Sequence, residues 1–481
     1  MQKTITLLLV IFSLNASAQS SITWGMGTNV ATSASGNEHP RIALDGAGNP
    51  LVLWGHSNRA MFSYWNGTMF TAPVMINPMS RSIAEANWMG PDIASHGDTV
   101  YVVMKQIPEA ADTSHLMIRK SVDGGMTFGP TIIVDNIADS ISRFPTVTVD
   151  NNGNPVVGFM KFDASFMDSR WVVARSNNLG TSFQIDRKAS GWSGGLICDC
   201  CPGQIIHNGN DVHMVYRDNL NNTRVIWDGV STDNGASFNS GFLADQTSWS
   251  VNMCPGSGPD ATIIGDTLYT TFFNRVTGTA RVYLSRSSVS NATCSNTSLL
   301  TGMIMNLNAQ NFPRIASYGN ALAVIWTQNV NGNDELMMRF TPNILNGLPA
   351  TLDTVDLGHI TNTDVILSNG KIFVVWEDDN SGTVKYREGT FTPDNTAVNF
   401  IEEKQISVYP NPATNELQIE NFVLKDGDEI EIVNVIGQTI LSKTISSSNE
   451  NTIDVSKITN GIYFLKIISG NETFVTKFVK D

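Results

Sequence analysis

The sequence predicts an all-β protein built from repeated sheets, and three observations support this prediction. A turn pattern of the form Ser-x-Asp-x-Gly-x-x-Phe recurs, and each of its serines is 55 positions after the previous one. A short strand, a glycine turn and a strand that ends in a large side chain recur seven times. After residue 400, apolar and polar residues alternate, which is typical of strands with one buried face.

The turn pattern has three clear copies, Ser121 to Phe128, Ser176 to Phe183 and Ser231 to Phe238, and a looser copy from Ser63 to Phe70. In each clear copy an Asp or Asn side chain accepts backbone N–H bonds, and glycine takes a positive φ. The terminal Phe packs back between strands. The pattern therefore predicts a tight hairpin turn in each repeat.

The glycine turns divide the chain into units of roughly 50 to 57 residues, each with about four strands, which is the size of a propeller blade. The glycines are Gly48, Gly97, Gly153, Gly209, Gly265, Gly319 and Gly370. We therefore predict a β-propeller with seven blades, with six as the alternative. The segment from Ile22 to Val30 has no glycine turn before it, so we expect it to complete the last blade and leave no open sheet edge.

The three turn copies resemble the Asp box, or BNR repeat, of sialidase-like β-propellers. This resemblance implies the fold alone, because Asp boxes also occur in propellers that are not enzymes. Residues 198–260 are further similar to a subgroup of these proteins with Cys-x-Cys-Cys-Pro, Tyr-Arg-Asp and Cys-Pro-x-x-Gly-Pro motifs. Here the motifs are residues 198–202, 216–218 and 254–259. The subgroup implies no activity, and it separates this chain from the hydrolases.

We predict three parts: a signal peptide over residues 1–18, the propeller over 19–400 and a small β-sandwich over 401–481. Lys3, an apolar run from Leu7 to Leu14 and a small-residue site ending at Ala18 are typical of a signal peptide, with a buried first strand as the alternative. The mature protein is then expected to be secreted.

The C-terminal part is similar to the type A C-terminal sorting domain of bacterial type IX secretion. The resemblance covers residues 405–481 and includes Tyr409-Pro-Asn-Pro412 and Asn460-Gly-Ile-Tyr463. It implies that the type IX machinery is a partner, and that the protein is released or attached to the outer cell surface. An appended immunoglobulin-like module is the alternative.

Composition restricts the remaining partners. The chain is 41% hydrophobic and carries a formal charge of -14, so it can bury a large core, and nucleic acid is not expected as a partner. No run after the signal peptide is long and apolar enough to predict a transmembrane span.

The loops that connect blades, and those after each second strand, converge near the axis of a propeller, where we expect a pocket. Arginines and carboxylates gather in these loops, which predicts a polar or anionic ligand such as a glycan. The expected ligand-binding residues are Arg41, Arg143, Arg217, Asp218, Arg275 and Arg314.

An alternative is an exo-acting glycoside hydrolase of the sialidase type. Sialidases resemble one another in three arginines that clamp a carboxylate, an Asp acid and a Tyr/Glu nucleophile pair, and a carboxylate suits the planar fork of arginine. The matching catalytic residues would be Asp92, Tyr216 and Glu377. The clamp would be Arg41, Arg314 and one of Arg143, Arg217 or Arg275. Here proline precedes Arg41 and Arg314, whereas the sialidase opening is Arg-Ile-Pro.

Four cysteines, Cys198, Cys200, Cys201 and Cys254, enter neighbouring blades on the axial face. Exported thiols tend to pair, so we expect two disulfides among these four cysteines. Geometry favours a link from Cys198 or Cys200 to Cys254 over a direct bond between Cys200 and Cys201. Thiolates at this density also suit copper(I) or zinc, which leaves a metal-binding protein as an alternative. The last alternative is an interaction scaffold, which would show neither turnover nor bound metal. Cys294 lies apart from the cluster.

Overall fold

The computed structural model describes residues 21–30, 36–394, 407–420, 422, 424–434, 438–446, 451–469 and 472–481. They belong to two compact units, Met1–Ala397 and Val398–Asp481. The predicted signal peptide lies outside the described residues. Within those residues, no helix has the length and hydropathy needed to cross a membrane.

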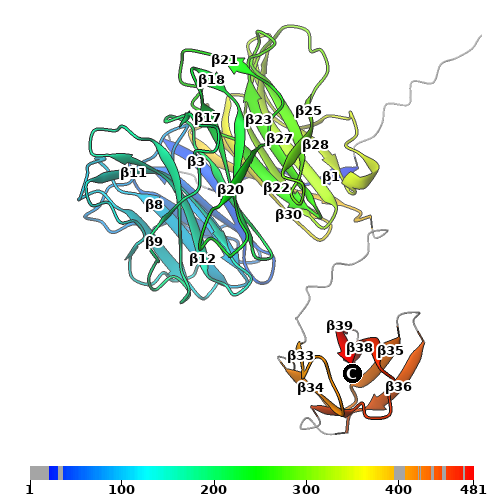
Figure 1. The fold of residues 1–481 in the computed structure, drawn as a ribbon. Coiled ribbons are helices and arrows are strands. Elements are labelled where there is room, and N and C mark those ends of the chain that lie inside the picture. The colour runs from blue at the N-terminus through cyan, green and yellow to red at the C-terminus, as the bar shows by residue number, and fades with distance from the viewer. Residues whose placement is uncertain are drawn as a thin grey trace, which may run out of the picture. The chain divides into compact units, whose positions relative to one another are not determined.

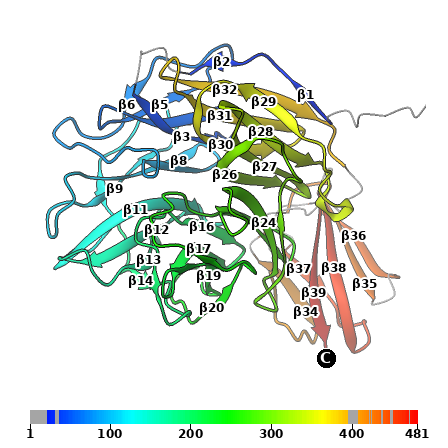
Figure 2. The same cartoon turned by 90° about the horizontal axis from the view of Figure 1, so that it is seen from above.

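The first unit consists of seven antiparallel blades (Figures 1 and 2). The first three blades are β3 (Asn37–Leu44), β4 (Pro50–His56), β5 (Ala60–Tyr64) and β6 (Val74–Met75); β7 (Asp92–His96), β8 (Thr99–Lys105), β9 (Leu116–Ser121) and β10 (Ile132–Ile133); and β11 (Ser140–Val149), β12 (Pro155–Asp163), β13 (Arg170–Arg175) and β14 (Arg187–Lys188).

The fourth blade contains β15 (Leu196–Ile197), β16 (Gln204–Asn208), β17 (Asp211–Asn219), β19 (Ile226–Ser231) and β20 (Ser240–Leu243), beside a small pair, β18 (Thr223–Arg224) and β21 (Trp249–Ser250). The fifth is β22 (Asp260–Ile264), β23 (Thr267–Asn274), β24 (Arg281–Ser288) and β25 (Thr293–Leu299). The sixth is β26 (Leu307–Tyr318), β27 (Ala321–Val330), β28 (Asn333–Thr341) and β29 (Asp353–Leu357), with a 3-10 turn at Ile344–Asn346.

The seventh blade closes the ring. It contains β30 (Ile360–Ser368), β31 (Lys371–Asp378) and β32 (Thr383–Phe391), and its fourth strand is β1 (Ile22–Trp24) from the other end of the chain. Ile22 pairs with Phe391, and β2 (Thr28–Asn29) also pairs with β32. The innermost strand β30 packs against β3. Both the predicted seven blades and the predicted closing segment are therefore confirmed.

The turns follow from the residues that predicted them. All seven glycines of the glycine turns have positive φ and join the first strand of a blade to the second. The turns that begin at Ser121, Ser176 and Ser231 join third strands to fourth strands. In the first of these, Ser121 Oγ accepts from the Gly125 N–H at 2.9 Å, and Asp123 accepts from the Thr127 N–H at 2.9 Å.

Large side chains near the ends of the second strands fill the spaces between blades. Trp54, Phe159, Tyr216, Trp326 and Trp376 are each exposed by 1% or less. Trp54 packs with Tyr386 of the seventh blade, and Trp326 packs with Phe273 of the fifth. The second strands are therefore held in the hydrophobic cores, which restricts what their side chains can offer a ligand.

The second unit is a small β-sandwich with a hydrophobic core of its own, as predicted. One sheet contains β33 (Ser407–Tyr409), β34 (Glu416–Glu420) and β37 (Thr452–Asp454). The other contains β36 (Thr439–Thr444), β35 (Glu429–Asn434), β38 (Gly461–Ser469) and β39 (Glu472–Lys480).

Candidate functional site

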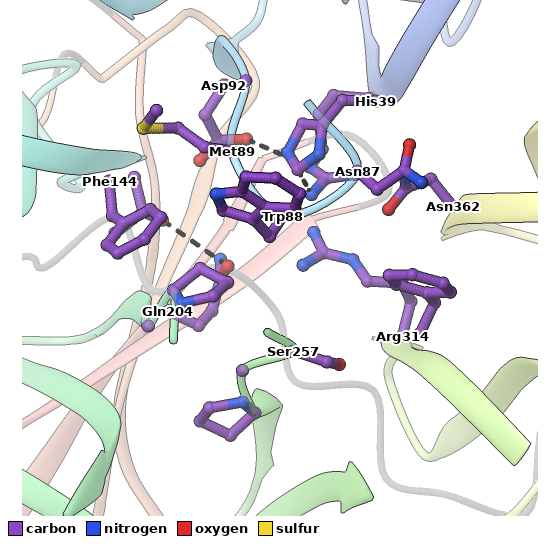
Figure 3. A pocket seen from close by; sticks show the side chains of 18 of the residues that line it. His39, Asn87, Trp88, Met89, Asp92, Phe144, Gln204, Ser257, Arg314 and Asn362 are labelled. Atoms are coloured by element: carbon purple, nitrogen blue, oxygen red, sulfur yellow. Dashed lines mark hydrogen bonds and ion pairs between the residues drawn. The ribbon is translucent and has the colours of Figure 1, made fainter. Parts of the chain in front are cut away.

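A cavity opens where the chain enters the innermost strand of each blade. Its volume is about 60 Å³, several times the roughly 10–15 Å³ that one water molecule needs. All seven blades contribute residues to its lining, and Figure 3 shows His39, Trp88, Phe144, Gln204 and Arg314 around it. Because residues at or just before the innermost strands of all seven blades contribute, the cavity lies on the axis of the ring.

One position of each blade, which we call the wall position, lines the cavity. It is occupied by His39, Gly90, Phe144, Pro202, Gly258, Phe312 and Asn362. Four of these are not glycine and still have positive φ: 56° at His39, 51° at Phe144, 49° at Phe312 and 42° at Asn362. The pairing register of the strand shifts at each of them, which marks β-bulges. Bulges re-aim side chains, and such strained backbone is concentrated at functional sites.

Glycine at two wall positions allows neighbouring blades to approach closely. A Cβ atom on Gly258 would lie 1.9 Å from the carbonyl oxygen of Pro202, and one on Gly90 would lie 2.5 Å from the His39 ring. No larger residue fits at either position without moving the adjacent blade.

Two residues after each wall position lies a second ring of polar side chains, which we call the polar ring. Its members are Arg41, Asp92, Thr146, Gln204, Asp260, Arg314 and Asp364. The aspartates connect blades through the backbone: Asp92 accepts from the Val147 N–H, Asp260 from the Ile315 N–H and Asp364 from the Ile42 N–H. The polar ring therefore both connects the blades at the axis and supplies charge at the cavity.

Arg314 is the polar-ring residue best placed to meet a ligand. Its Nε donates to Asp364 at 3.0 Å and lies 3.4 Å from a carboxylate oxygen of Asp260. Burial alone disfavours its charge, but Asp260, Asp364 and Asp92 outweigh burial and raise the pKa of Arg314 above its ordinary value. No other hydrogen bond of this guanidinium is formed among the described residues, and Figure 3 shows it directed into the cavity.

Arg41 is held differently. Its Nη2 donates to Nε2 of His39 at 2.6 Å, and its Nη1 donates to the Pro40 carbonyl at 2.8 Å. Burial and the charge of Arg314 lower the pKa of Arg41 to about 10. Burial and both arginines also lower the pKa of His39 well below its ordinary value, so His39 is neutral. Burial raises the pKa of Asp92, although the same arginines oppose this shift.

A tight turn places Trp88 at the cavity. Ala86 and Met89 exchange backbone hydrogen bonds across it, so Trp88 is held at the tip of the turn with half of its surface exposed. Asn87 and Met89, on either side, also line the cavity. Figure 3 shows that Trp88 and Arg314 line the same cavity.

Residues 407–481 match the family described as "Secretion system C-terminal sorting domain". The second unit is a sorting domain. The protein is therefore exported by type IX secretion to the cell surface or the extracellular space, and the sorting domain is the part that the secretion machinery recognises. A comparison with curated protein sequences found no match.

Several solved structures are similar to the chain at low identity. A protein of unknown function from Dyadobacter fermentans is 10% identical, with a TM-score of 0.46 over 77% of this chain and 99% of that chain. An alpha-L-arabinofuranosidase of Fusarium graminearum is 9% identical, with a TM-score of 0.45 over 67% and 98%. A Trypanosoma rangeli sialidase is 11% identical, with a TM-score of 0.43 over 92% and 84%. We draw no functional conclusion from similarity at this level.

Of the predicted ligand-binding residues, Arg41 and Arg314 line the cavity and the other four do not. Arg143 Nε donates to Glu109 at 2.9 Å, and its guanidinium lies over the rings of Phe162 and Phe166. Arg217 and Asp218 are buried on β17. Arg275 follows β23 and is exposed to solvent.

Of the predicted catalytic residues, only Asp92 lines the cavity. Tyr216 is fully buried in a hydrophobic cluster, where its hydroxyl accepts from the Gly191 N–H at 3.3 Å and burial raises its pKa. Glu377 lies behind the wall and accepts from the His39 N–H and the Asn362 amide, each at 3.2 Å. The nucleophile role predicted for Tyr216 does not fit these positions, because its hydroxyl cannot reach a ligand in the cavity.

The cysteines form one disulfide, between Cys200 and Cys254, which is one of the two links to Cys254 that the sequence favoured. The expectation of a second disulfide among the four is wrong, because Cys198 and Cys201 are both free. Cys198 and Cys201 are unbonded, with their sulfur atoms 3.1 Å apart. The sulfur atoms of Cys198, Cys200 and Cys201 lie within 4.8 Å of one another. With Cys200 in a disulfide, the cluster offers two thiols, and the four-ligand set of structural zinc sites does not fit it. Cys294 lies apart on β25.

Thr146, Gln204 and Asn362 also line the cavity, and none of them was predicted. For Thr146 and Gln204 a signal exists in the repeat itself. A polar residue precedes the apolar run of each innermost strand, as in Pro40-Arg-Ile42 and Pro145-Thr-Val147. Aligning the seven strands on this position would have found the whole polar ring.

Proposed function

We propose that the exported protein is a binding protein, and that its axial cavity holds a polar ligand with anionic or hydroxyl groups, such as a glycan. The observation that supports this most strongly is the guanidinium of Arg314, whose terminal nitrogens are directed into the cavity. A guanidinium is suited to carboxylate, sulfate and vicinal hydroxyl groups, because its donors lie in one plane.

The other lining residues suit the same ligand class. The half-exposed indole of Trp88 offers a flat apolar face, while Asn87, Gln204 and Ser257 offer amide and hydroxyl groups. Small-molecule sites combine apolar walls with a few converging polar groups. We further propose that the chain belongs to the sialidase-like Asp-box propellers and to their subgroup with the Cys-x-Cys-Cys-Pro motif.

We favour binding over glycoside hydrolysis. Hydrolysis with two carboxyl groups or with a Tyr nucleophile needs a second reactive group on the other side of the bond from the acid. Asp92 lines the cavity, but Glu377 lies behind the wall and Tyr216 is buried between blades. Asp92 alone does not supply this chemistry.

The test is a binding measurement on a panel of immobilised oligosaccharides with uronic-acid, sulfated and sialylated members, followed by titration of the best one. We expect Trp88→Ala to weaken binding at least tenfold, because the ligand loses its stacking surface, and Trp88→Phe to keep most of the affinity. Tyr318→Ala is the matched control, because Tyr318 is also 50% exposed but lies at the Gly319 turn, at the far end of its innermost strand.

Two results would contradict the proposal: no member of the panel binds, or Trp88→Ala and Tyr318→Ala behave alike. The same preparation should release no sugar from a fluorogenic sialoside. Release that disappears in Asp92→Asn would instead support the hydrolase.

A further inference from the structure

The four clustered cysteines combine a surface disulfide with a buried dithiol. Cys254 is exposed and Cys200 half-buried, whereas Cys198 and Cys201 are exposed by 1% and 0%. The Sγ of Cys198 lies 3.7 Å from that of Cys200 and 3.1 Å from that of Cys201. Cys198 is therefore in contact both with the disulfide and with the thiol that could resolve a new bond.

A buried cation favours a thiolate at this position. Arg217 is 1% exposed and lies over the rings of Trp249 and Phe273. Its Nη2 donates to the Phe273 carbonyl, but its Nε and Nη1 have no acceptor among the described residues. Buried donors without an acceptor are costly, and both the buried carboxyl of Asp245 and a thiolate of Cys198 interact favourably with the charge of Arg217. The hydrogen bond from Cys201, together with Arg217, lowers the pKa of Cys198 to about 7 despite its burial.

We propose that these cysteines form a thiol–disulfide exchange centre, which passes two electrons from the buried Cys198–Cys201 dithiol through the surface disulfide to a disulfide in solution. The centre is a second activity, separate from ligand binding in the axial cavity.

The internal exchange has two steps. The thiolate of Cys198 attacks Sγ of Cys200, and Cys254 leaves as a thiolate on the exposed side. Cys201 loses its proton and attacks Sγ of Cys198, and Cys200 leaves as a thiolate. Two thiols have become a Cys198–Cys201 disulfide, and the Cys200–Cys254 disulfide has become two thiols, so no other oxidant is consumed.

The external exchange restores the surface disulfide. The Cys254 thiolate attacks one sulfur of an external disulfide, and the first external thiolate leaves. Cys200 then attacks Cys254 in this mixed disulfide and releases the second. The net reaction converts one external disulfide into two thiols and oxidises the buried dithiol. Because solvent meets Cys254 and does not reach Cys198, the surface pair is needed for this transfer.

The test uses the full chain with Cys294→Ser, which removes the remaining thiol, brought to two thiols per chain with limiting dithiothreitol. The probe is 5,5′-dithiobis(2-nitrobenzoate), a disulfide whose released thiolate is coloured. We expect the native protein to release two equivalents, carry no adduct, and contain both the Cys198–Cys201 and Cys200–Cys254 disulfides by peptide mapping after acid quench.

Two variants separate a relay from direct access to the buried thiols. Cys201→Ser allows the first exchange and blocks its resolution, so one equivalent should be released and one adduct should remain on Cys254. In the double variant Cys200→Ala/Cys254→Ala, release of the coloured thiolate should slow at least tenfold. Near-ultraviolet circular dichroism checks that this variant is folded, and titration in urea should still count two thiols per chain.

Several outcomes would overturn the proposal. One is that the double variant reacts as fast as its parent, and another is that the Cys201→Ser adduct is found on Cys198. The proposal also fails if the two-thiol state forms only on unfolding, or if elemental analysis finds tightly bound copper or zinc that blocks the thiols. None of these outcomes depends on whether the axial cavity binds a glycan.

Discussion

Glu377 shows how a single buried side chain links the cavity wall to pH. Its carboxylate accepts from the backbone N–H of His39 and from the amide of Asn362, both wall residues. Burial raises its pKa to about 7, although both hydrogen bonds oppose this shift. A carboxyl group with a raised pKa stabilises the fold while it is protonated, and this contribution is lost as pH rises through the folded-state value.

We therefore predict that part of the unfolding free energy is present at pH 4.5 and lost by about pH 8. One pKa unit corresponds to about 1.4 kcal/mol, so the loss through this group is at most about 3 kcal/mol. Glu377→Gln should remove this part of the pH dependence, as measured by urea unfolding at pH 5 and pH 8. Asp92 and Asp260 remain in both proteins and so cancel in the comparison. Parallel curves for the two proteins would exclude the role of Glu377.

Single residues also mark where sequence reasoning failed. Arg217 and Tyr216 end a second strand on the predicted face, but both side chains turn between blades into hydrophobic cores. The position in the sequence predicts where the strand ends, but it does not predict the direction in which each side chain points. That direction depends on which apolar neighbours, such as Trp249, surround it, and these come from distant segments.

Elements were predictable where one residue type has a clear conformational role. Glycine at positive φ located every first turn, and the serine-led turns located third-to-fourth hairpins. The four wall bulges were not predicted, because His39, Phe144, Phe312 and Asn362 have no common preference for positive φ. Packing around the axis imposes that conformation, so the local sequence does not predict it.

One serine-led turn and one glycine turn together allow a paired test of strain and packing. Gly125 has a φ of 88°, and a Cβ there would lie 2.4 Å from the Phe62 ring, whereas Gly209 has a φ of 65° with open space around it. Gly209→Ala should cost about 1 kcal/mol through backbone strain. Gly125→Ala should cost about 1–3 kcal/mol more through overpacking. If denaturant unfolding shows equal losses of unfolding free energy in the two variants, the Phe62 ring moves aside without cost.

At the scale of the whole molecule, the sequence predicted the number of blades and the closing segment, because both depend on repeat counting. The closing strand β1 covers the edge of β32, and Ile22 is 6% exposed there. An uncovered edge presents unpaired backbone groups that promote association.

Deleting residues 21–30 should therefore lower the thermal unfolding temperature and produce higher oligomers on size-exclusion chromatography. Deleting residues 407–481 is the control, because the sorting domain has a separate core. It should leave the unfolding temperature of the propeller unchanged. Similar effects of the two deletions would show that the closing strand has no special role.

The pairing of Ile22 with Phe391 has a consequence for how the ring is assembled in time. During synthesis the first strand emerges long before its partner, and it must stay unpaired until nearly the whole propeller has been made. The last step is thus the contact with the largest sequence separation, and such contacts slow folding because a long loop must close first. A chain that ends before the seventh blade would have six complete sheets and an unpaired first strand. Its two exposed sheet edges could then pair with another copy of the chain.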